Sequence, residues 1–66
     1  MNLREKIKER LDALQKMMEC QEHLSNPEAV TEKLESISKF WSVLSEEDRE
    51  WTAAARMALN SQMKWN

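Results

Sequence analysis

Cysteine and histidine are the residue types in this chain most often used for chemistry, and each occurs once. Cys20 and His23 form a C-x-x-H pair, and side chains three residues apart share a face of a continuous helix. A structural zinc site needs four ligands, so this pair could complete one only with its symmetry mate in a dimer. The alternative, which we favour, is a thiol at the core edge and a histidine whose charge suits a helix C-terminus. We therefore expect no metal ligand and no cofactor.

Nucleophilic catalysis has less support than metal binding. The chain contains no glycine, so the usual material of oxyanion and phosphate-binding loops is missing, and one histidine must serve any nucleophile–base pair. Carboxylates are plentiful, but the pattern places them on exposed helix faces. A chain of 66 residues can hardly enclose a substrate pocket. We expect no enzyme, no catalytic residue and no small-molecule substrate.

The stretch WSVLSEEDREW, residues 41–51, places four acids and one arginine between two tryptophans. Most of it fits a helix start, because Ser45 can cap the helix and acids in the first turn gain ~0.3–1 kcal/mol each from the helix dipole. Glu50 is not needed for capping, and the acids flank an aromatic side chain that could anchor an interface. The hypothetical partner-binding residues are Glu46, Glu47, Asp48, Glu50, Trp51 and Trp65.

A basic segment, REKIKER, opens the chain and suggests an alternative surface. Its bases could follow a phosphate backbone, which would make the protein a small dimeric nucleic-acid-binding regulator. Two acids interrupt the segment, however, and the isoelectric point is near 5.4, whereas nucleic-acid-binding domains usually lie above about 9. We expect neither nucleic-acid nor membrane binding, since the apolar stripe of this segment is needed to cover other helices. The alternative basic face comprises Arg4, Lys6, Lys8 and Arg10.

Size and charge favour a single domain that associates with itself. The net charge is only −2, but residues 1–16 carry five bases against three acids, and residues 17–50 carry three bases against nine acids. Such polarity suggests antiparallel self-pairing, the basic end against the acidic middle. A chain this short builds a small core, and one cysteine cannot form an internal disulfide. With no apolar run of about 18 residues and no signal-peptide pattern, we expect a cytoplasmic protein.

Helix formers dominate the composition, and three possible N-caps divide the chain. Asn2, Ser25 and Ser45 are each followed three residues later by an acid, and Pro27 strengthens the second start. We therefore expect one all-α domain over residues 1–66, with helices at about 3–24, 27–44 and 46–65. Only one serine separates the last two, so the fold is either a three-helix mini-bundle or a helical hairpin with a kinked second helix. Homodimerisation would complete either one.

Apolar residues at helical spacing predict the core or dimer interface. We expect Trp41 and Trp51 to close the core across the junction between the last two helices. Trp65 remains for a second subunit or another protein to cover. The predicted core or dimer residues are Leu11, Leu14, Met18, Leu34, Ile37, Trp41 and Leu44.

Three motifs in the C-terminal half carry a resemblance: FWSVLSEEDREW, then AR-x-AL, then Q-x-x-W, spanning Phe40 to Trp65. This half resembles small uncharacterised proteins encoded by T4-like phages of marine cyanobacteria. The resemblance implies an accessory protein in the cytoplasm of an infected host, and it implies no site residues. Taken with the composition, we expect a non-enzymatic protein–protein interaction module that forms a homodimer and docks on a host or phage protein.

Overall fold

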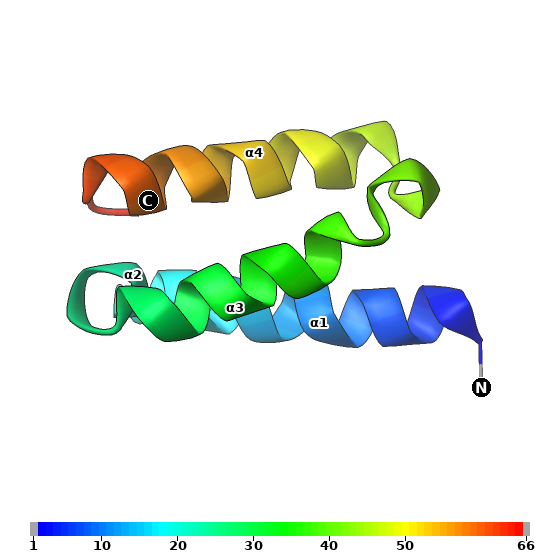
Figure 1. Ribbon diagram of the computed structural model, residues 1–66, viewed down its shortest axis with the longest axis horizontal. Coiled ribbons are helices and arrows are strands. Elements are labelled where there is room, and N and C mark those ends of the chain that lie inside the picture. Colours follow the sequence, from blue (N-terminus) through cyan, green and yellow to red (C-terminus); the bar gives the residue numbers. More distant parts are fainter. Residues whose placement is uncertain (1, 66) are drawn as a thin grey trace.

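The computed structural model describes residues 2–65, and over these residues the chain is helical with no strand. This confirms the all-α prediction. Three longer helices and one short helix pack together, and α3 runs in the opposite direction to α1 and α4 (Figure 1). Consequently α1 and α4 begin at the same end of the molecule. The elements are α1 (Leu3–Glu19), α2 (Glu22–Ser25), α3 (Pro27–Ser38), the 3-10 helix η1 (Trp41–Val43) and α4 (Glu46–Ser61).

Two of the three predicted N-caps are confirmed. The backbone N–H of Arg4 donates to the side chain of Asn2 at 3.0 Å, and that of Asp48 donates to Ser45 Oγ at 3.2 Å. The middle cap is wrong, because Ser25 is the last residue of α2. Helix α3 starts instead at Pro27, whose fixed φ suits a first helical position and whose missing N–H needs no cap.

The predicted helix 3–24 is wrong beyond Glu19, because the chain turns there. Gln21 lies in the left-handed region with φ 58°, and the single turn of α2 follows it. Left-handed backbone costs a non-glycine residue roughly 1–2 kcal/mol. This turn allows α3 to fold back against α1.

The other two predicted helices also end early. Helix α3 ends at Ser38, and Leu44 and Ser45 are extended, with ψ of 145° and 161°. The kinked continuous helix is therefore not adopted. Helix α4 ends at Ser61 rather than Trp65, where Gln62 takes a second left-handed conformation with φ 53°.

The core lies where α1 and α4 pack against α3, and most of its residues were predicted correctly. Leu11 packs at its edge and is half-buried. Trp41 is a wrong prediction as a core residue, since its side chain is 39% exposed. Because α3 ends at Ser38, the helical spacing that would carry Trp41 inward stops, and Phe40 packs against the core instead. The buried apolar residues are Ile7, Leu14, Met18, Val30, Leu34, Ile37, Leu44, Ala55 and Leu59.

Over the part of the chain that the structure describes, no helix combines the length and apolar character of a membrane span.

Candidate protein-binding groove

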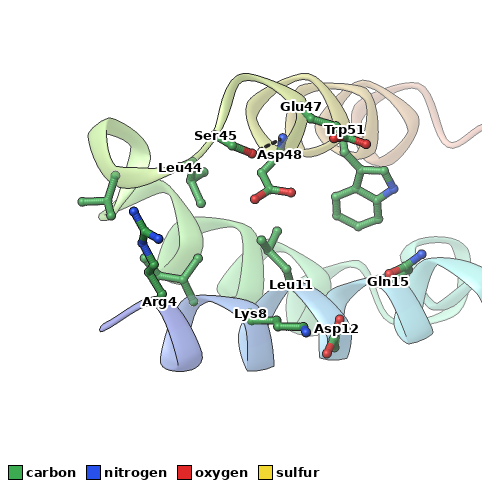
Figure 2. Close-up of a pocket in the computed structure, with 12 residues that line it drawn as sticks. Arg4, Lys8, Leu11, Asp12, Gln15, Leu44, Ser45, Glu47, Asp48 and Trp51 are labelled. Atoms are coloured by element: carbon green, nitrogen blue, oxygen red, sulfur yellow. Dashed lines mark hydrogen bonds between the residues drawn. The ribbon is translucent and has the colours of Figure 1, made fainter. Parts of the chain in front are cut away.

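An open groove runs between α1 and the η1–α4 segment, because α3 packs against both helices and holds them apart (Figure 2). Its volume is about 750 Å³. In Figure 2 Asp48 lies opposite Leu11, and Trp51 lies nearer Gln15, so successive turns of the two helices face each other. The groove is lined on the α1 side by Arg4, Ile7, Lys8, Leu11, Asp12 and Gln15, and on the η1–α4 side by Val43, Leu44, Ser45, Glu47, Asp48 and Trp51. We call the polar residues of each side its wall and the apolar residues of both sides the floor.

Apolar side chains form the floor of the groove. Ile7 and Leu44 are buried, Leu11 and Trp51 are half-buried, and Val43 is 48% exposed. The floor is thus continuous with the core but open to solvent. An exposed apolar strip bordered by polar residues is typical of a protein-binding surface.

The two walls carry opposite charges. On the α1 wall the exposed bases Arg4 and Lys8 outnumber the one exposed acid, Asp12, while the α4 wall carries Glu47, which is exposed, and Asp48, which is half-buried. The sequence had suggested the acidic and basic segments as alternative surfaces. The structure places them on opposite sides of one groove, because α1 and α4 begin at the same end.

The remaining predicted charged residues lie outside the groove lining. Arg10 places its guanidinium carbon 5.3 Å from the centre of the Phe40 ring, and Lys6 is exposed. The four bases therefore do not form one continuous face. On α4, Glu46 and Glu50 are exposed and belong to neither wall.

Trp65, which the sequence left for a partner to cover, is half-buried against its own chain. After Gln62 the chain leaves the helix, and the ring of Trp65 meets that of Trp51 edge-on, with centroids 5.6 Å apart and planes at 74°. The side chain of Gln21 forms two hydrogen bonds with the Trp65 backbone, at 2.8 and 2.9 Å. Residues 62–65, which we call the C-terminal strap, thus contact Trp51 through the Trp65 ring.

His23 and Cys20 do not form a joint site. The left-handed Gln21 separates them, so His23 is fully buried while Cys20 is exposed. The Nε2 atom of His23 forms a hydrogen bond with the carbonyl oxygen of Met63, in the strap, and Nδ1 is buried without a partner. Over residues 2–65, no group of three or more His, Cys, Asp and Glu side chains could hold a metal ion.

Sequence reasoning missed three residues that shape the groove and its surroundings. Gln21 forms hydrogen bonds with a residue 44 positions along the chain, and Arg49 with residues up to 8 positions away. The periodicity of apolar residues gives no signal for either contact. Val43 was detectable as an apolar residue next to the predicted core position Leu44, but its exposure depends on the η1 turn. Leu11 and Leu44 were identified as core residues, and both also line the groove.

Comparison with known proteins finds no matching family model, no similar curated protein and no similar solved structure.

Proposed function

We propose that this protein is a non-enzymatic protein–protein interaction module that binds its partner in the groove between α1 and α4. The observation that carries the proposal is the combination of an apolar floor with two oppositely charged walls. Apolar contact supplies affinity, and charges on the rim orient the partner and exclude others.

The shape of the groove favours a helical partner. Residues 4–15 of α1 line one side, about 16 Å or three turns long at 1.5 Å per residue. A partner that presents an amphipathic helical surface to such a groove would cover its apolar floor. The flanks of that surface would carry acids toward Arg4 and Lys8 and bases toward Glu47 and Asp48.

The environment of the single histidine supports a function without catalysis. Its side chain has no solvent-exposed surface, and Nε2 is engaged by the strap, so a substrate in the groove could not reach it. Cys20, the single thiol, is exposed on the α1–α2 turn and has no histidine beside it to serve as a base.

The resemblance over Phe40–Trp65 adds a biological setting to the proposal. A small accessory protein in an infected host would need a surface that holds one host or phage protein. The groove includes part of the resembling segment, from Val43 to Trp51.

Site-specific photo-crosslinking tests the proposal. Benzoylphenylalanine replaces Gln15, on the groove wall, or Glu32, exposed on α3 outside it, in the cell that expresses the protein. We expect one discrete adduct from position 15 and none from position 32. The exposed Val43, changed to glutamate, should abolish the adduct without unfolding the chain. Equal labelling from both positions, or none from position 15, would overturn the proposal.

A further inference from the structure

We infer that the partner held in the groove is a second copy of this chain, docked about a two-fold axis parallel to α1 and α4. The inference rests on the proposed function and names its partner. It depends on the position of the charges along the two helices and on the accessible surface of the chain.

The charges on the two walls match under one particular symmetry. A rotation of 180° about an axis parallel to the helices, above the groove, lays each α1 over α4 of the other copy. The two helices begin at the same end, so the basic start of α1 meets the acidic first turn of α4: Lys8 arrives at about the level of Asp48, and Arg4 arrives one turn nearer the helix starts, beside Leu44 (Figure 2). The symmetry repeats this basic-on-acidic contact, because a two-fold interface uses each pair of patches twice.

A two-fold axis perpendicular to the helices does not give this match. It would lay α1 over α1 in antiparallel orientation, so that Arg4 approaches the last turn of the other copy's α1, which carries both Lys16 and Glu19, rather than its acidic wall. It would also turn Glu47 toward the distal, alanine-rich part of the second α4. The antiparallel pairing expected from the order of charges along the chain is therefore replaced by a parallel one. Because α3 runs in the opposite direction to α1 and α4, the basic segment and the acidic segment lie at the same end of the molecule.

The accessible surface of the chain supports closure of the two grooves on each other. The accessible surface of the chain is 4858 Å², whereas a compact monomer of 7.8 kDa exposes about 4,400 Å². Facing grooves would cover the exposed Val43 and the half-buried Leu11 and Trp51 of both copies. A standard interface needs about 800 Å² per subunit, roughly a sixth of this surface.

Reciprocal charge reversal tests this arrangement. One variant carries Arg4→Glu and Lys8→Glu, and the other Glu47→Lys and Asp48→Lys. Each alone would place like charges together at both contacts, and we expect the dimer dissociation constant to rise at least ~100-fold. An equimolar mixture restores opposite charges at both contacts, so a heterodimer should form with a dissociation constant within ~10-fold of the unchanged protein's. Sedimentation at micromolar concentration measures all three.

A matched reversal outside the groove controls for net charge. Glu32→Lys with Glu35→Lys, both exposed on α3, should leave the dimer unchanged. Circular dichroism on every variant shows that the helices remain, and rescue in the mixture cannot come from unfolded chains. A monomeric unchanged protein, reversals that stay dimeric, or a mixture of folded variants without rescue would each overturn the inference.

Cysteine pairing tests the parallel orientation separately. In a Cys20→Ser background, chains carrying Lys8→Cys should form a mixed disulfide with chains carrying Glu47→Cys. Chains carrying Gln15→Cys, about two turns further along α1, should not. Preferential pairing of position 15 with position 47 would overturn the parallel axis.

The crosslinking experiment distinguishes failure here from failure of the proposed function. An adduct from position 15 with twice the subunit mass supports both. An adduct with another protein, from a chain that sediments as a monomer, supports the proposed function and overturns the second-copy partner. No adduct and no dimer would overturn both.

Discussion

The side-chain amide of Gln21 pairs with the backbone of Trp65. Its Nε2 donates to the Trp65 carbonyl oxygen at 2.8 Å, and its Oε1 accepts from the Trp65 N–H at 2.9 Å. This double hydrogen bond holds the strap against the α1–α2 turn and sets the Trp65 ring edge-on against Trp51. Because Trp51 lines the groove, Gln21 helps to fix one end of the groove from outside it.

Replacing Gln21 with alanine should lower the free energy of unfolding and release Trp65. Each neutral hydrogen bond contributes roughly 0.5–1.5 kcal/mol, so the expected loss is ~1–3 kcal/mol. Urea denaturation followed by circular dichroism measures it, and tryptophan emission should shift to the red in the folded state. Gln62→Ala is the matched control, since Gln62 shares the left-handed backbone and is exposed. Equal losses in the two variants would assign the effect to the backbone and refute the role of the amide.

Thr52→Val should stabilise the protein. Thr52 is 1% exposed, and its hydroxyl oxygen is buried without a hydrogen-bond partner. Valine keeps the branched shape and removes the uncompensated polar group, for an expected gain of ~1 kcal/mol. In a domain of this size that gain raises the melting temperature by roughly 4–8 °C. Thr52→Ser keeps the hydroxyl and loses a methyl group, so it should lower the melting temperature; a fall with valine would contradict the argument.

Arg49 should stabilise the turn between α3 and α4. Its Nε donates to the carbonyl oxygen of Trp41 at 2.9 Å, and its Nη2 to that of Ser42 at 3.1 Å. Arg49→Ala should cost ~1–2 kcal/mol, and lysine should recover only part, because an ammonium lacks the fork of donors. Arg56→Ala is the comparison, since Arg56 makes a single 3.3 Å contact with the Ser38 hydroxyl. A larger loss for Arg56 in thermal denaturation would show that the fork is unimportant.

The protein should not retain nucleic acid. Arg4 and Lys8 lie beside an acidic wall, and Arg10 lies over Phe40, so few bases are free to follow a phosphate backbone. We expect no mobility shift of DNA or RNA with micromolar protein at ~50 mM salt, where electrostatic binding is strong. Retention that is lost when Lys6, Lys8 and Arg10 become neutral would instead establish the nucleic-acid-binding alternative.

Local signals predicted the helices well and their ends poorly. The caps at Asn2 and Ser45 are confirmed because a capping side chain acts within three residues of itself. The ends at Glu19 and Ser61 were missed because glutamine, rather than glycine, occupies the left-handed position after each helix. Nothing in the intrinsic preference of glutamine marks such a turn, and at Gln21 the stabilising contact comes from the strap.

The groove was predictable in parts but not as an arrangement. Glu47, Asp48 and Trp51 were identified as one surface, and Arg4 and Lys8 as another, from their charges and spacing. Their juxtaposition depends on the direction of α3, which is set by turns that the sequence pattern did not reveal. Trp41 illustrates the same limit, because its spacing fits a core position in a helix that ends before it.

The strap also bears on the order in which the molecule folds. Its two anchors are the hydrogen bonds of His23 with Met63 and of Gln21 with Trp65, which span 40 and 44 positions of the sequence. Only the short helix α2 separates α1 from α3 along the chain. Closing a long loop costs more chain entropy than closing a short one. We therefore expect the hairpin of α1 and α3 to form first and the strap to dock last. By the same reasoning the strap opens before the helices melt. In that opened state Trp51 loses its aromatic neighbour while the helices persist, and amide exchange at Trp65 would report the opening.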